Sequence, residues 1–179
     1  MIVNTAKKYS PKSLDEFIFP NEEARELVTA YSSGEIERPL ILYGSSGSGK
    51  SLLQRLIPQA IERKETQVNK VICSDLEMPS DIHELYGRNK HFSKVFTVNG
   101  QRYNYFIIEE FYMKSIRLND ALKIELDATL GTDLTIFSTN RFELIDSGIL
   151  SRSETLEVQP CTPSIFFPHA KKIMQSEEI

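Results

Sequence analysis

The stretch that decides the fold is Leu40-Ile41-Leu42-Tyr43-Gly44-Ser45-Ser46-Gly47-Ser48-Gly49-Lys50-Ser51-Leu52. Its first four residues form a short apolar run, which is typical of a buried strand. From Leu52 to Ile61 the apolar residues recur with helical spacing. Between them, Gly44–Ser51 matches G-x-x-x-x-G-K-[ST] at every fixed position. Strand, loop and helix in this order predict a phosphate-binding loop (P-loop), and the alternative is a flexible Gly/Ser linker.

The chemistry of triphosphate binding accounts for the composition of this loop. Small residues let the backbone curl so that its N–H groups face the β-phosphate, and the helix N-terminus adds positive charge. Lys50 is predicted to neutralise phosphate oxygens and the Ser51 hydroxyl to ligate Mg²⁺. The loop therefore predicts a nucleoside triphosphate with Mg²⁺, and because the sequence offers no guanine-specificity Asn-Lys-x-Asp motif, the predicted cofactors are ATP and Mg²⁺. The nucleotide-binding residues predicted in the loop are Gly44, Ser45, Ser46, Gly47, Ser48, Gly49, Lys50, Ser51 and Leu52.

Two carboxylates follow a second apolar run, Phe106-Ile107-Ile108. In a P-loop ATPase this is the place of a Walker B element, in which the first acid supports Mg²⁺ and the second polarises the attacking water. We therefore assign Glu109 to the metal and Glu110 to catalysis. A solvated acidic pair at a strand end is the alternative.

Further strands are predicted at 71–73, 134–137 and 155–158. Helices are predicted from Asn21 to about residue 33, from Lys50 onward, at 81–86, around 118–126 and at 164–174, with Pro58 kinking or interrupting the second. Asn99-Gly100 predicts a hairpin turn. Alternating strands and helices predict a three-layer α/β/α fold with a five-stranded, mostly parallel sheet.

Composition excludes several classes of protein. The 179 residues are 40% hydrophobic and 26% charged, with a net charge of −4. This balance argues against a surface that coats nucleic acid or an anionic membrane. Two cysteines exclude a disulfide framework, and the three histidines show no metal-ligand spacing. No apolar run approaches a membrane span, so we expect a cytoplasmic protein without a membrane partner.

The order of motifs resembles the AAA+ P-loop ATPases. A P-loop, a Walker B strand, a strand that ends in Thr139-Asn140 and then Ser151-Arg152-Ser153 follow one another. The opening residues 8–17, KYSPKSLDEF, resemble the start of clamp-loader subunits. Ala121-Leu122 with Leu126-Asp127 resembles the helix before their sensor strand. The likeness is therefore greatest to clamp-loader subunits, and it extends to bacterial replication initiators and helicase loaders.

The resemblance implies further roles. Asn140 orients the water or the γ-phosphate. Arg152 reaches the γ-phosphate of a neighbouring subunit, with an ordinary surface arginine as the alternative. Tyr9, Ile18 and Phe19 border the adenine, with core packing as the alternative for Ile18 and Phe19. The predicted catalytic residues are thus Glu110, Asn140 and Arg152, and the predicted metal-binding residues are Ser51 and Glu109. An oligomer of AAA+ subunits is implied, with replication proteins and DNA as possible partners.

The sequence also departs from the family. Glu109 replaces the usual Asp, Ser10 an Arg and Ser153 a Cys. We predict an AAA+ domain at 1–159 and a linker with a partial lid helix at 160–179, which makes the lid truncated. Two functions remain open. One is an ATPase of the DNA-replication type that assembles or remodels a protein complex on DNA and whose activity depends on its own assembly into an oligomer. The other is a scaffold or loader subunit that binds ATP and hydrolyses it poorly.

Overall fold

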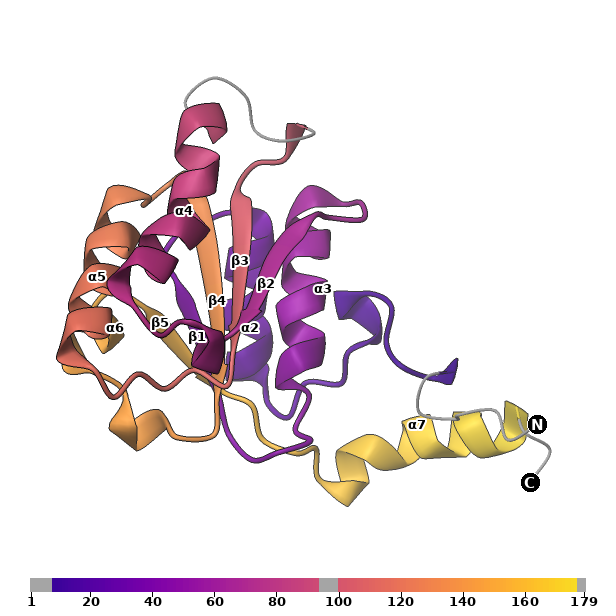
Figure 1. The fold of residues 1–179 in the computed structure, drawn as a ribbon. Helices are drawn as coiled ribbons and strands as arrows, with labels where there is room; N and C mark the ends of the chain where they lie inside the picture. The colour runs from indigo at the N-terminus through magenta and orange to yellow at the C-terminus, as the bar shows by residue number, and fades with distance from the viewer. Residues whose placement is uncertain (1–7, 94–99, 177–179) are drawn as a thin grey trace, which may run out of the picture.

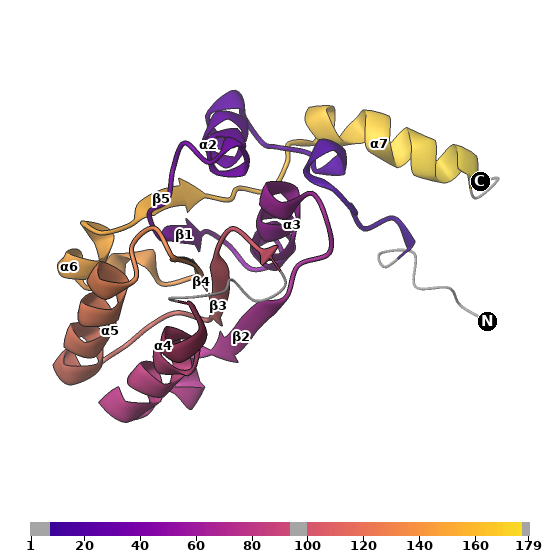
Figure 2. The same ribbon diagram turned by 90° about the horizontal axis from the view of Figure 1, so that it is seen from above.

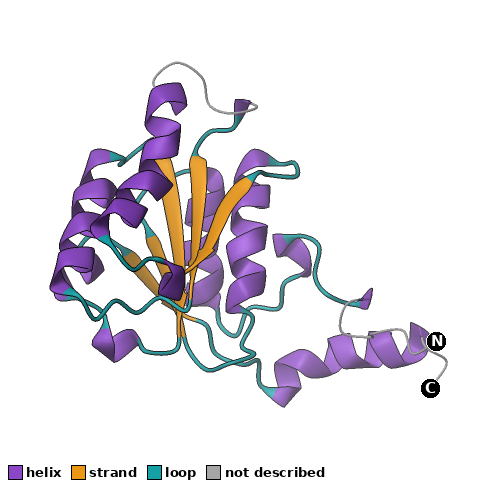
Figure 3. Cartoon of the chain, in the orientation of Figure 1, coloured by secondary structure: helices purple, strands orange, loops and turns teal. Residues whose placement is uncertain are grey.

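A computed structural model describes residues 8–93 and 100–176 of the chain (Figure 1). Five strands form one sheet in the order β2-β3-β4-β1-β5, and every pair of neighbours is parallel. The strands, shown in orange in Figure 3, are β1 (Leu40–Tyr43), β2 (Val68–Ile72), β3 (Asn104–Glu109), β4 (Asp133–Thr139) and β5 (Glu154–Glu157). The sheet confirms the predicted fold class.

Helices cover both faces of the sheet (Figure 2). Helices α2 (Glu22–Ser33) and α3 (Lys50–Glu62) lie on one face, and α4 (Pro79–Ser93) and α5 (Ile116–Ala128) on the other. The short helices are η1 (Leu14–Glu16), η2 (Cys73–Asp75), η4 (Phe142–Leu144) and α6 (Ser147–Leu150), and α7 (Pro163–Ser176) ends the described chain. The helical segments alternate with strands, so the layers follow from the order of elements in the sequence.

Alternation along the strands divides the core into two clusters. Leu40 and Leu42 of β1 pack with α2 and α3, whereas Ile41 between them packs with α4 and α5. Tyr105 and Phe106 of β3 divide in the same way. Such a strand is buried on both faces, which explains why β1 and β3 are apolar runs rather than alternating ones. Strand β4 is also buried along its whole length, although it includes polar residues.

Local sequence signals set the ends of α2. The Asn21 side chain accepts a hydrogen bond from the Ala24 amide at 2.8 Å, and Gly34 ends the helix in the left-handed conformation. Of the two outcomes predicted at Pro58, an interruption is wrong, because α3 continues through this residue to Glu62. Leu56, Ile57 and Pro58 are all buried, and this burial offsets the cost of a proline inside a helix.

Three expected elements differ in length or pairing. Strand β2 begins at Val68 and α4 extends to Ser93, so both are longer than the apolar pattern indicated. The turn residue Asn99 and the segment 94–98, which would precede it in the predicted hairpin, lie outside the described residues. On the other side of the turn only Asn104 belongs to a strand, and β3 pairs in parallel with β2 and β4.

Helix α7 lies beside the sheet domain, next to the N-terminal segment (Figure 1). The two are joined by a 2.6 Å hydrogen bond between the Tyr9 hydroxyl and Ser176 Oγ. Residues 158–162, which connect β5 to α7, have no regular secondary structure. Within the described ranges, no helix combines the length and the apolar character needed to cross a membrane.

Candidate nucleotide-binding site

The P-loop connects the carboxyl end of β1 to the first turn of α3. Its backbone takes conformations that favour glycine, since φ is 135° at Gly44 and 104° at Gly49. A Cβ on Gly44 would come within 2.5 Å of the Val158 carbonyl oxygen, and one on Gly49 within 3.3 Å of the Phe17 ring. The fixed glycines of the motif therefore allow both the curl of the loop and the close approach of neighbouring segments.

Gly44→Ala is expected to lower the free energy of unfolding by about 1–3 kcal/mol, because the new methyl group meets backbone and the φ of 135° strains any L side chain. Urea denaturation measures the change. Gly87→Ala is the matched control, because a Cβ there meets nothing within 4 Å and the residue lies inside α4. The control should gain up to about 1 kcal/mol from helix propensity. Equal stability of the two variants would contradict this account of Gly44.

The Lys50 side chain packs back against the backbone of the P-loop. Its Nζ donates hydrogen bonds to the carbonyl oxygens of Gly44 at 2.9 Å and Ser45 at 2.6 Å, and only 9% of the residue is exposed. Burial lowers the pKa of the ammonium group from its ordinary value. The two hydrogen bonds offset part of the free-energy cost of burying the charged ammonium group. When a nucleotide binds, the same group can donate to phosphate oxygens instead of to the two carbonyl oxygens.

The loop faces the ends of β3 and β4 across a cavity of about 370 Å³. Carboxyl ends of adjacent parallel strands meet at one edge of a sheet, so residues distant in sequence converge here. Besides loop residues the walls are acidic and polar, and the full lining is Ser46, Gly47, Gly49, Lys50, Ser51, Leu52, Glu109, Glu110, Thr139 and Asn140. The structure thus brings most of the predicted loop residues together with Glu109, Glu110 and Asn140, whereas the predicted Gly44, Ser45 and Ser48 are not part of this lining. Thr139 was not predicted.

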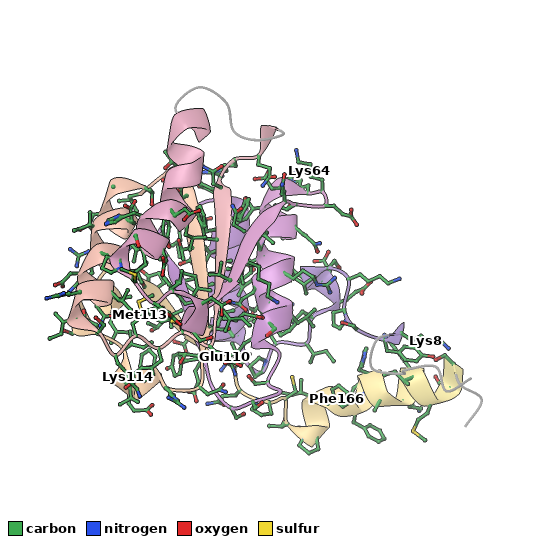
Figure 4. All side chains as sticks on the ribbon, viewed as in Figure 1. Lys8, Lys64, Glu110, Met113, Lys114 and Phe166 are labelled. Carbon is green, nitrogen blue, oxygen red and sulfur yellow. The ribbon has the colours of Figure 1, made fainter. Side chains whose placement is uncertain are left out.

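Glu110 occupies an unusual backbone position. Its φ is 53°, a left-handed conformation rare outside glycine, which costs on the order of 1 kcal/mol. The turn reverses the chain after β3, and the Phe111 amide then donates to the Ser138 carbonyl of β4 at 2.8 Å. Figure 4 shows the exposed Glu110 at the end of the sheet where the loop toward Met113 and Lys114 begins. Strain at this point coincides with the residue assigned to catalysis.

Glu109 forms an ion pair with a residue that sequence reasoning missed. Lys70 of β2 places its Nζ 2.8 Å from Glu109 Oε2. The Glu109 side chain is 19% exposed and that of Lys70 is 55% exposed. The signal in the sequence was weak, because it required the knowledge that β2 is the strand next to β3.

The donor atoms in the cavity suit Mg²⁺ bound together with a nucleotide. Ser51 supplies a hydroxyl oxygen and Glu109 a carboxylate, both hard oxygen ligands. In the part of the chain that the structure describes, no group of three or more His, Cys, Asp or Glu residues could hold a metal ion. A metal in this cavity would therefore depend on phosphate oxygens and water for its remaining ligands, as Mg²⁺ in nucleotide sites does. When bound, it would neutralise phosphate charge.

A second hollow, of about 480 Å³, continues from the loop toward α7. It shares Gly47 and Leu52 with the phosphate cavity and includes Ser48. Ser48 Oγ is buried and has no hydrogen-bond partner among the described atoms. The remaining walls are mainly apolar: Tyr9, Ser10, Pro11, Phe17, Ile18, Pro160, Cys161, Phe166, His169 and Ile173. This composition fits a nucleobase.

Two of the three residues predicted to border the adenine line the second hollow, and the third does not. Tyr9 and Ile18 line the second hollow, whereas Phe19 does not. The Phe19 ring packs edge-on against Phe17 at a centroid distance of 4.9 Å and lies under the Arg25 guanidinium. The contributions of Cys161 and of α7 were missed, because nothing in the sequence indicated that α7 returns to the N-terminal segment.

Arg152 lies away from the P-loop of its own chain. It precedes β5, whose first residue, Glu154, pairs with Leu40 at the start of β1. The loop begins beyond the end of β1, about 13 Å further along the strand. Two guanidinium nitrogens donate to the two Asp127 oxygens, each at 2.8 Å, and this contact lowers the pKa of Asp127. Arg152 is therefore held at the opposite end of the sheet from its own nucleotide site.

A larger groove, of about 920 Å³, lies at the other end of α3 and contains no P-loop residue. Lys12, Arg55, Arg63 and Lys64 contribute its positive charge. Two of these cations follow the C-terminus of α3, where they complement the helix dipole. We therefore do not assign a nucleotide to this groove.

Comparison with known proteins supports the fold. No protein-family model matches the sequence, and no curated protein does. Solved structures match, among them three variants of RuvB from Thermotoga maritima with TM-scores of 0.69–0.70 and 19–20% sequence identity. The alignments cover 95–96% of this chain and 55–56% of RuvB, so the chain spans about half the length of these structures. At this identity the likeness shows the fold alone, an α/β fold with a five-stranded parallel sheet.

Proposed function

We propose that the chain is an ATP-binding subunit of the AAA+ class that uses Mg²⁺ and hydrolyses ATP when subunits assemble. The observation that carries the proposal is the convergence of Lys50, Ser51, Glu109, Glu110 and Asn140 on one cavity at the carboxyl end of the sheet. Lys50 would bind phosphate, Ser51 and Glu109 the metal, and Glu110 would accept a proton from the attacking water. Asn140 would orient that water or the γ-phosphate.

Assembly into an oligomer forms part of the proposal because of Arg152. A guanidinium at the far end of the sheet has no role at its own phosphate, whereas it can act at a neighbour's. We further propose that the protein works with replication proteins on DNA, in the manner of a clamp-loader subunit. The support for this is the N-terminal segment, since Tyr9 and Ile18 border the same hollow as the P-loop residues Gly47 and Ser48.

A second candidate is a scaffold or loader subunit that binds ATP and hydrolyses it poorly. The specific observation in its favour is the pair between Lys70 and Glu109, which engages the carboxylate proposed to support the metal. Turnover near zero in the assembled protein, with unimpaired ATP binding, would favour this candidate over the first.

Lys50→Ala tests the nucleotide site and is expected to weaken ATP binding about a hundredfold or more, because two charge-assisted contacts to phosphate are lost. Isothermal titration calorimetry with ATP and Mg²⁺ measures the change. Lys50→Met, which keeps much of the buried stem, should lose binding equally and separates charge from packing. Lys64→Ala, beyond the far end of α3, is the matched control and should bind like the parent. Undiminished affinity in both Lys50 variants would overturn the assignment.

A further inference from the structure

Lys70 and Glu109 lie on the same face of the sheet. Strands β2 and β3 are parallel, with Lys70 beside Ile107 and Ile72 beside Glu109. Because side chains two residues apart share a face, Lys70 and Glu109 both lie on the face that carries Val68 and Tyr105. Those two residues pack into the cluster that contains α3. The lysine therefore approaches the phosphate cavity from the side of the P-loop helix.

In this contact the Lys70 ammonium group neutralises the Glu109 carboxylate without a metal ion. Lys70 Nζ lies at 2.8 Å from Oε2, a charge-assisted distance. Glu109 also lines the cavity together with Ser51, so the same carboxylate faces both the lysine and the expected metal position. A divalent cation that uses this carboxylate must displace the ammonium group or bind beside it, against like-charge repulsion.

A simpler interpretation of Lys70 is that it is a surface lysine that keeps an edge strand from pairing with other chains. Strand β2 is at the edge of the sheet, where lysines discourage pairing with other chains. That role needs only an exposed charge and no particular carboxylate. The observed pair instead reaches a side chain that is four-fifths buried and lines the cavity. The two interpretations differ in what happens when Lys70 loses its charge.

We propose that Lys70 is a positioning residue that holds Glu109 and competes with Mg²⁺ for it, so that it raises the Mg²⁺ concentration needed for tight nucleotide binding. The inference rests on the proposed function, because it assumes that ATP binds at the P-loop. It identifies β2, which carries none of the predicted motifs, as the strand that tunes the site.

The experiment measures ATP affinity by calorimetry across a series of free Mg²⁺ concentrations. In Lys70→Met the half-saturating Mg²⁺ concentration should fall about threefold to fivefold, the size expected for a partly exposed ion pair. Lys70→Arg keeps the charge and should resemble the parent. Lys64→Met, a lysine remote from the cavity, is the matched control and should also resemble the parent. Affinity in EDTA should be equal in the parent and in Lys70→Met.

A double-mutant cycle shows whether Lys70 acts through Glu109. In a Glu109→Gln background the Lys70→Met substitution should no longer change the Mg²⁺ dependence. An unchanged or increased Mg²⁺ requirement in Lys70→Met would overturn the inference, and so would an equal shift in the Glu109→Gln background. If the parent binds ATP at no Mg²⁺ concentration, the proposed function fails and this inference with it. If the parent binds and Lys70→Met is unshifted, only this inference fails.

Discussion

Replacing Arg152 by alanine is expected to lower ATP turnover of the assembled protein by about 10³-fold or more, the lower end of the effect of an arginine finger in P-loop proteins. ATP affinity should stay the same, because Arg152 lies at the opposite end of the sheet from its own P-loop. The isolated chain should be largely monomeric at low concentration and a slow ATPase. Steady-state turnover measured against protein concentration, or with a partner subunit, should therefore rise in the parent and stay flat in the variant.

A matched control and a mixing experiment sharpen this prediction. Arg117→Ala removes an exposed arginine from α5, the helix that carries Asp127, and should leave turnover intact. Mixing Arg152→Ala with Glu110→Gln subunits should partly restore activity, because one supplies an intact site and the other an intact arginine. Brisk turnover that is independent of concentration and indifferent to the loss of Arg152 would refute action between subunits.

Glu110→Gln is expected to lower turnover by about 10²- to 10⁴-fold while ATP binding is retained, since only the water-activating carboxylate is removed. Glutamine is close in size to glutamate, so the substitution should add no steric strain to the left-handed backbone at this residue. Single-turnover hydrolysis and calorimetry on the same preparation measure the two properties separately.

Glu109→Gln is the informative neighbour of this variant. It should mainly weaken the effect of Mg²⁺ on binding, because Glu109 is proposed to support the metal rather than the water. Two variants that hydrolyse ATP as fast as the parent would mean that the carboxylates at the end of β3 are not a Walker B pair.

The sequence was informative where one local pattern sufficed. The P-loop signature lies between a strand and a helix as predicted, and Asn21 and Gly34 bound α2 as their capping preferences indicate. The apolar runs in the middle of the chain became the central strands, because strands buried on both faces need no alternation.

Predictions failed where tertiary packing decides. The propensity of Pro58 indicated a kink or a break, but the helix continues through it, with Leu56, Ile57 and Pro58 itself buried. The extra length of β2 came from pairing with β3, which the sequence of β2 alone does not reveal. Two of the residues that sequence reasoning missed at the site, Lys70 and Cys161, are likewise brought there by neighbouring elements.

The motif comparison singled out Arg152 as a candidate residue but did not predict the residue that it contacts. Asp127 was noted only as part of a helical motif, and its bidentate contact with Arg152 depends on the packing of α5 against α6. Which residues touch across helices follows from the fold and not from spacing along the chain. The same limit applies to Phe19, whose sequence neighbours Ile18 and Phe17 both reach the second hollow while its own ring does not line it.

The most direct test of the central claim is a crystal structure of the chain with Mg²⁺ and a non-hydrolysable ATP analogue. We expect the β-phosphate within the Gly44–Ser51 loop, the base between Tyr9 and Ile18, and Lys50 Nζ on phosphate oxygens instead of the Gly44 and Ser45 carbonyls that it contacts here. A nucleotide bound elsewhere on the protein, or a loop in which Lys50 keeps both carbonyls beside a saturating analogue, would contradict the account.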